Sequence, residues 1–143
     1  MHGAAHSCGH SRVRDLGPLS ACKGLLTLDC YNTNVVELGP LAACRGLQTL
    51  HCYGTRVKSL GPLAACTGLQ TLSCSHTQVS VLDPLASCTR LQNVACLCTE
   101  MADVAPLAAY TELTSLVCSR GIPLGQIQQL QAACANLHYI NQF

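Results

Sequence analysis

Tryptophan is absent from the chain, aromatic residues make up 3% of it, and charged residues only 10%. Eight Lys and Arg stand against seven Asp and Glu, for a formal net charge of +1. The sequence therefore lacks the basic stripe typical of nucleic-acid-binding proteins. No apolar run approaches the roughly 18 residues that a membrane span needs, and the polar beginning lacks the apolar segment of a secretory signal. These absences argue against nucleic acids and membranes as partners.

Hydrophobic residues are plentiful: they fill 49% of the 143 positions and include twelve cysteines. With so few aromatic residues, the core must be built from Leu, Val, Ala and Cys. A chain of this length fits one domain. Many cysteines can indicate a disulfide scaffold, a metal site or a thiol-rich core, and their positions decide between these interpretations.

A 22-residue repeat orders the chain. The segments LGPLSACKGLLTLDCYNTNVVE, LGPLAACRGLQTLHCYGTRVKS and LGPLAACTGLQTLSCSHTQVSV begin at residues 16, 38 and 60, and LDPLASCTRLQNVACLCTEMAD follows without a gap. A strict period of roughly 20 to 29 residues is typical of a solenoid, in which each repeat forms one coil. We number the coils so that position 1 is Leu25, Leu47, Leu69, Leu91 and Leu113.

Each coil is predicted to contain one short strand and one corner. Polar and apolar residues alternate around position 5, as in Thr49-Leu50-His51-Cys52-Tyr53, which is typical of a strand with one buried face. The GPLAAC stretch is too short for a good helix, and its proline fits a 3₁₀ turn or an extended corner. Helical spacing of apolar residues occurs only near the end, which predicts a helix at about 125–133 and a last strand near 139–143.

The repeat LxxLxCxxTxVxxLxPLxxC resembles the leucine-rich repeat, and it is similar to the 22-residue SDS22-like and internalin-like subtype, LxxLxLxxNxIxxIxPLxxL. The resemblance covers residues 7 to about 140. It implies an α/β leucine-rich repeat solenoid, a right-handed coil with a parallel β-sheet on the concave face and short 3₁₀ or irregular corners on the convex face. The chain departs from the family at position 6, where Cys replaces an aliphatic residue, and at position 9, where Thr replaces Asn. Because the family's Asn bonds backbone groups between coils, we expect a thinner ladder from the Thr hydroxyls.

We expect a single domain over residues 1–143. It divides into a partial first coil at 7–24, coils at 25–46, 47–68, 69–90 and 91–112, a longer helix-bearing coil at 113–136 and a partial last strand at 137–143. The stretch HSCGHSRV aligns with the second half of a coil, which places Cys8 inside and His10 outside. A zinc site there is therefore not predicted. Since a solenoid end without a cap exposes its core, we expect fraying before about residue 7 and weak self-association through this edge.

The cysteines follow the repeat register. Position 6 holds Cys8, Cys30, Cys52, Cys74, Cys96 and Cys118, position 20 holds Cys22, Cys44, Cys66, Cys88 and Cys134, and only Cys98 falls outside both columns. Buried free Cys behaves as a small apolar residue, and a column of thiols does not converge on a metal ion. Disulfides between adjacent coils are the alternative. We predict free core thiols, no metal or cofactor, and a reducing, cytoplasmic location.

No catalytic constellation is predicted from the carboxylates and nucleophiles. Among the seven carboxylates only Asp29 falls on a concave strand, and no carboxylate is expected beside His51 and Ser73. Cys98 has no neighbour expected to activate its thiol. The chain is therefore predicted not to be an enzyme.

The candidate binding surface is an aromatic and polar patch at the N-terminal end of the concave face. It consists of Tyr31, His51, Tyr53, Asn32, His76 and Asp29, with Arg56 and Lys58 on its rim. Exposed tyrosines are frequent anchors of protein interfaces, although a tyrosine column that only shields strand edges is the alternative. We predict a protein–protein interaction module that binds a partner on the concave face. A structural segment of a longer solenoid, or a regulatory subunit of an enzyme such as a phosphatase, is the alternative function.

Overall fold

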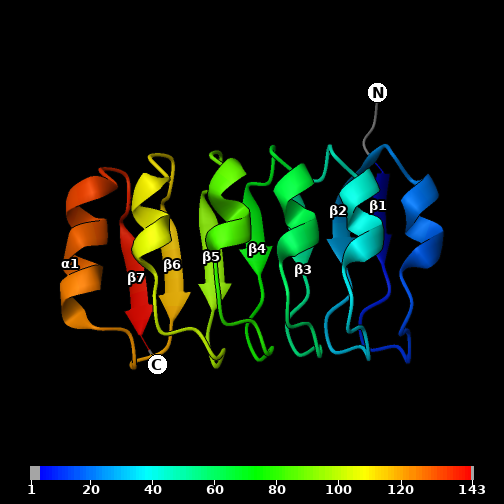
Figure 1. Ribbon diagram of the computed structural model, residues 1–143, viewed down its shortest axis with the longest axis horizontal. Coiled ribbons are helices and arrows are strands. Elements are labelled where there is room, and N and C mark those ends of the chain that lie inside the picture. The colour runs from blue at the N-terminus through cyan, green and yellow to red at the C-terminus, as the bar shows by residue number, and fades with distance from the viewer. Residues whose placement is uncertain (1–3, 143) are drawn as a thin grey trace.

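A computed structural model describes residues 4–142, and within them the strands form one parallel sheet of seven, β1 to β7, in chain order. The strands are Ala4–Ser7, Leu25–Asp29, Thr49–His51, Thr71–Ser73, Asn93–Cys96, Ser115–Cys118 and Tyr139–Gln142. Between them lie the 3₁₀ helices η1 to η5, at Gly17–Ala21, Gly39–Ala43, Gly61–Ala65, Asp83–Ser87 and Ala105–Ala109, and the helix α1 at Leu124–Ala133. Figure 1 shows the coils following one another along the long axis, with the chain ends at opposite ends.

Parallel pairing aligns the same repeat position of successive coils. Leu28 pairs with Leu50, Leu50 with Leu72, and Leu72 with Val94, all at position 4. Each position therefore forms a column along the solenoid, and the predicted leucine-rich repeat fold is confirmed.

The inward columns form one continuous core. Leu63, at position 17 of a central coil, is fully buried, as are Leu41 and Leu85 in the coils on either side. Thr67, four residues later, is exposed. The expected inward and outward positions of these residues are confirmed.

Proline explains the 3₁₀ corners. In η2, Pro40 occupies the first turn, where its missing N–H costs nothing and its fixed φ suits the turn. The amides of Leu41 and Cys44 donate to carbonyls three residues earlier, of Leu38 and Leu41, at 2.8 and 2.9 Å. Only the last coil replaces this corner with an α-helix, which begins one residue before the expected start. The predicted last strand ends at Gln142, and Phe143 lies outside the described residues.

The turns after strands β1 to β5 each have a left-handed residue at position 8. His10, Asn32, His76 and Cys98 have φ between 51° and 57°, and Gly54 has φ 67°. At position 9, Thr33 Oγ1 donates to the Cys30 carbonyl at 2.7 Å, and Thr55 repeats the bond to Cys52 at 2.7 Å.

These threonine bonds differ from the expected ladder, because each stays within its own coil. A hydroxyl on a short side chain reaches the carbonyl three residues back and closes the turn there. The predicted link between coils is therefore wrong for these threonines.

The first coil begins earlier than the sequence suggested. Strand β1 starts at Ala4 and pairs with β2, with His6 opposite Leu28 and Ser7 opposite Asp29. Parallel backbone pairing does not require Leu at position 4, and His6 stays exposed there. A paired strand thus lies before residue 7, where fraying was expected.

All twelve cysteines are free thiols. At position 20 each buried thiol lies against carbonyls of the preceding coil: Cys66 Sγ is 3.5 Å from the Leu41 oxygen and 3.4 Å from that of Cys44. Tyr110 takes the next place in this column and donates its hydroxyl to the Leu85 carbonyl. Cys22 is exposed, against expectation, because no earlier coil covers it.

Candidate functional site

The outward positions 3, 5 and 7 make up the concave face, and their side chains change in size along it. Position 5 reads Asp29, His51, Ser73, Ala95 and Val117, and position 7 reads Tyr31, Tyr53, Ser75, Leu97 and Ser119. Large side chains thus occupy both positions in the coils of β2 and β3, whereas Ser73 and Ala95 at position 5 and Ser75 at position 7 are small; Leu97 is the larger residue of the β5 coil. The face has a raised N-terminal part and a lower part beside it.

Tyr31 and Tyr53 stack on each other in the raised part. Their ring centroids are 4.8 Å apart and the planes differ by 7°. His10 meets Tyr31 edge-on, with centroids 4.9 Å apart and planes at 89°. A Cβ on Gly9 would lie 2.5 Å from Tyr31 Cζ, so the missing side chain of Gly9 makes room for this ring. Both tyrosines are half-buried and are held in place before any partner binds.

Asp29 lies directly beside His51, which overturns the expectation that no carboxylate adjoins it. Asp29 Oδ1 is 2.8 Å from His51 Nδ1, because parallel pairing places Asp29 and His51 side by side. This oxygen is buried and accepts no well-aligned hydrogen bond from the described residues. The contact therefore acts as an ion pair when the imidazole is protonated.

Ser73 is the register partner of His51 on the next strand, so an Asp, a His and a Ser lie in one row across β2, β3 and β4. A nucleophilic serine needs a hydrogen bond to its base. Among the described contacts, the Ser73 hydroxyl makes none to His51. As it stands, the row does not form an activated nucleophile.

The remaining predicted site residues lie around this row. Asn32 and His76 are exposed at the left-handed turn position, two coils apart, with Gly54 between them. A Cβ on Gly54 would lie 2.1 Å from Asn32 Oδ1, so Asn32 folds over that glycine. Arg56 and Lys58 are exposed at positions 10 and 12, after the turn. The structure brings Tyr31, Tyr53, Asp29 and His51 together and leaves His76 and the two cations at the margin.

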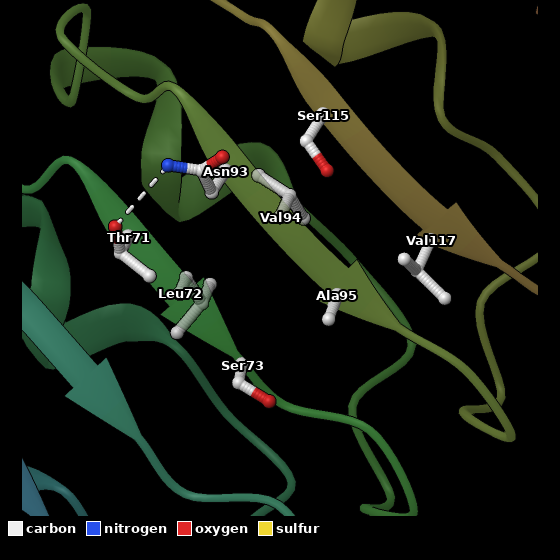
Figure 2. A pocket seen from close by; sticks show the side chains of 8 residues that line it. All are labelled: Thr71, Leu72, Ser73, Asn93, Val94, Ala95, Ser115 and Val117. Carbon is white, nitrogen blue, oxygen red and sulfur yellow. Dashed lines mark hydrogen bonds between the residues drawn. The ribbon is translucent and has the colours of Figure 1, made fainter. Parts of the chain in front are cut away.

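A hollow of about 90 Å³ lies in the lower part of the face, over β4, β5 and β6. Figure 2 shows its lining, which includes Thr71, Ser73, Asn93, Ala95, Ser115 and Val117. Asn93 Nδ2 donates to Thr71 Oγ1 at 3.5 Å across its edge. Of these residues only Ser73 was considered from the sequence, as a neighbour of His51, and a hollow was not expected; the fall in size from His51 to Ser73 and Ala95 at position 5 is the signal that marks it.

Metal ligands do not gather on residues 4–142: no group of three or more His, Cys, Asp or Glu side chains is placed to hold an ion there. Cys8 packs partly against the core, and His10 is exposed beside Tyr31. Within the same residues no helix is long and apolar enough to cross a membrane.

The chain resembles known proteins in its three-dimensional structure. No family model matches the chain, and no curated protein matches it either. Internalin C2 of Listeria monocytogenes superposes with a TM-score of 0.81 at 25% identity, over 93% of this chain and 58% of that one. A leucine-rich repeat protein of Leptospira interrogans gives 0.83 at 15% identity, over 94% and 36%.

A third solved structure is the functional domain of InlJ from Listeria monocytogenes, described as including a cysteine ladder. It gives a TM-score of 0.76 at 20% identity, over 92% of this chain and 27% of that one. The chain therefore spans between 27% and 58% of the length of these three structures. With its 22-residue coils, parallel sheet and 3₁₀ corners, the chain has the leucine-rich repeat fold, and its structure is similar to those of internalins.

Proposed function

We propose that the chain is a non-enzymatic interaction module that binds a protein partner on its concave face, with Tyr31 and Tyr53 at the centre of the interface. Its leucine-rich repeat neighbours support a protein-interaction module in general. The observation that carries the proposal is the stacked pair of half-buried tyrosines on an open sheet face. Tyrosine is enriched among the residues that dominate interface energetics.

The tyrosine pair suits this role because it is ordered in advance. Tyr31 rests over Gly9 and against His10, and Tyr53 rests on Tyr31. A side chain that is already fixed loses less conformational entropy on binding, so more of its contact energy contributes to affinity. Beside the stack, Asp29 and His51 add polar groups whose charges offset each other when the imidazole is protonated.

The size of the face limits the affinity. Seven strands at about 4.8 Å spacing give a length of roughly 30 Å, and three outward residues per strand add a height of roughly 13 to 16 Å. The product, about 400 to 500 Å², falls short of the roughly 800 Å² that each partner buries in a standard interface. The concave strands alone therefore support weak binding, and Arg56 and Lys58 extend the contact at the rim.

The test compares capture of binding proteins by the wild-type chain and by a Tyr31→Ala/Tyr53→Ala variant. A partner of the concave face should lose at least about 2 kcal/mol of binding free energy, roughly thirtyfold in affinity, with the tyrosines removed. Thr67→Ala, exposed in the turn between η3 and β4, is the matched control and should leave binding unchanged. Binding that survives the loss of both tyrosines would place the working face elsewhere.

A second candidate is self-association through the N-terminal end. An apolar hollow of about 230 Å³ opens there, lined mainly by Cys8, Val13, Leu16, Pro18 and Leu19. Strand β1, whose four residues are exposed, forms the edge of the sheet on the same side. Unpaired strand edges beside apolar surface favour pairing with another chain.

We also propose that the protein works in a reducing, cytoplasmic compartment. Twelve unpaired thiols in one small domain support this, because thiols persist where glutathione and thioredoxin keep them reduced. Counting reactive thiols in freshly prepared, denatured protein without reductant tests it. Fewer than twelve, with the loss restored by reductant, would indicate an oxidising location.

A further inference from the structure

The hollow over β4, β5 and β6 has a chemistry of its own, distinct from the tyrosine stack. Its floor and far side carry the methyl groups of Ala95 and Val117. Around them stand the hydroxyls of Ser73 and Ser115 and the amide of Asn93 (Figure 2). No lining residue is charged.

The hollow exists because of a step in side-chain size between neighbouring strands. In the row at position 5, the half-buried imidazole of His51 is followed by Ser73 and then by Ala95. In the row at position 7, Tyr53 is followed by Ser75. The contact of His51 with Asp29 and the stack of Tyr53 on Tyr31 support these tall residues from the other side. The result is a low region bounded on one side by a supported wall.

We propose that this hollow is a subsite that receives one uncharged aliphatic side chain, of the size of valine or leucine, from the partner bound on the concave face. The proposal rests on the proposed function and specifies the kind of residue that the partner presents. Its volume, about 90 Å³, is small, and its mainly apolar lining suits a compact aliphatic side chain.

Charge argues for an apolar occupant. A charged side chain in the hollow would lose hydration and gain no counter-charge, since no lining residue is ionisable. The nearest ionisable row members, Asp29 and His51, already contact each other. The hydroxyls of Ser73 and Ser115 stand beside the methyl groups and can bond the partner's backbone on either side of the inserted residue.

The experiment uses blocked amino acids as probes and follows the methyl resonances of the whole chain by NMR. N-acetyl-leucine methylamide should shift the Ala95 and Val117 methyl signals in a saturable way, with a dissociation constant on the order of millimolar. N-acetyl-glutamate methylamide should not. Ala95→Phe, which fills the hollow from an outward strand position, should weaken leucine binding at least tenfold. Ala86→Phe, exposed in η4, is the matched control and should leave it unchanged.

Three results would overturn the subsite: equal shifts from the leucine and glutamate probes, shifts that survive Ala95→Phe, or no saturable shift. Circular dichroism of Ala95→Phe checks that the variant folds, and Ala95→Leu provides a smaller filling residue for the same comparison. With a captured partner, the outcomes separate further. Loss of binding in Tyr31→Ala/Tyr53→Ala but full binding in Ala95→Phe would refute the subsite alone, whereas full binding in both would refute the proposed function as well.

Discussion

At the scale of single residues, position within the coil decides what a side chain does. Leu63 and Thr67 are four residues apart in one corner, yet one is fully buried and the other exposed. The backbone sets equally sharp requirements: Gly54 has φ 67° and lies under the Asn32 side chain, whereas Gly68 has open space around it. The same substitution at Leu63 and Thr67, or at Gly54 and Gly68, therefore shows how the position in the coil affects stability.

Leu63→Ala should lower the free energy of unfolding by about 2 to 5 kcal/mol, because it leaves a cavity between Leu41 and Leu85 in the same column. Thr67→Ala should change it by less than about 0.5 kcal/mol, as surface substitutions do. Chemical denaturation followed by circular dichroism measures both. Equal effects would mean that the inward and outward positions have been exchanged.

Gly54→Ala should destabilise the protein by about 1 to 2 kcal/mol, the cost of a left-handed conformation for a residue with a Cβ. Contact with Asn32 Oδ1 adds to this cost, and Asn32→Gly, which tolerates the left-handed φ of that position, should relieve that part. Gly68→Ala is the control, since a Cβ there meets nothing within 4 Å. Thermal unfolding of Gly54→Ala, of Gly68→Ala and of the double variant at Gly54 and Asn32 measures these effects. A Gly54→Ala protein as stable as Gly68→Ala would contradict the prediction.

At the scale of elements, the strand and the 3₁₀ corner each contribute a column of thiols. Burial, and next the neighbouring thiols, raises the pKa of Cys66 from its ordinary value of 9.0 to about 11. Burial also raises the pKa of Cys74 to about 12. Protonated thiols are poor nucleophiles, so these columns are inert at neutral pH. Cys22, at the N-terminal end of the position 20 column, and Cys98, outside both columns, are exposed.

A thiol reagent at pH 8 should therefore modify Cys22 and Cys98 first in the folded protein, followed by the partly covered Cys8. In denaturant all twelve thiols should react. Mass spectrometry of digested samples identifies the modified sites. Rapid modification of Cys52 or Cys74 in the folded state would contradict the burial of the position 6 column.

The same pKa shifts predict how stability depends on pH. The folded pKa values of Cys66 and Cys74 lie above their ordinary value of 9.0, so above pH 9 the unfolded chain releases its thiol protons first. The stabilisation is complete below pH 9 and is lost as the pH rises toward 11 and 12. Denaturation midpoints should be flat from pH 7 to 8.5 and fall beyond. Replacing Cys66 by Ala should make this fall shallower; an unchanged slope would argue against the assignment.

At the scale of the whole molecule, a solenoid has two ends, and the core leucines near its N-terminal end are less completely covered than those of the central coils. Leu16 and Leu19 are 3% and 7% exposed there, whereas the corresponding leucines of central coils are fully buried. Cys22 shows the same loss of cover. Among the described residues, apolar surface thus lies beside β1, the edge strand of the sheet.

Light scattering should show weak, concentration-dependent association of the wild-type chain. Ala5→Lys, on the exposed edge strand, should abolish it, because an edge lysine opposes strand pairing. His76→Lys adds the same charge at a distant exposed turn and should leave association intact. A strict monomer over a wide concentration range would exclude self-association through this end.

The sequence by itself determined the columns. A strict 22-residue period with fixed apolar positions allows one solenoid register, so Leu63, Thr67, the thiol columns and the fold followed without coordinates. The same register makes residues 22 apart neighbours, yet the contact between Asp29 and His51 was not expected from the sequence, and only the structure revealed it. The alignment of equivalent residues along a column follows from the 22-residue period, which can be read from the sequence.

Only the tertiary structure decided how the columns are filled. The ring of Tyr31 settles over Gly9, the Thr hydroxyls bond within their own coil, and a hollow opens beside His51 because Ser73 and Ala95 are short. Strand β1 forms without a leucine at its inward position, because backbone pairing suffices. These features depend on side-chain directions and on the volume left between neighbouring coils, and a repeating pattern of residue types specifies neither.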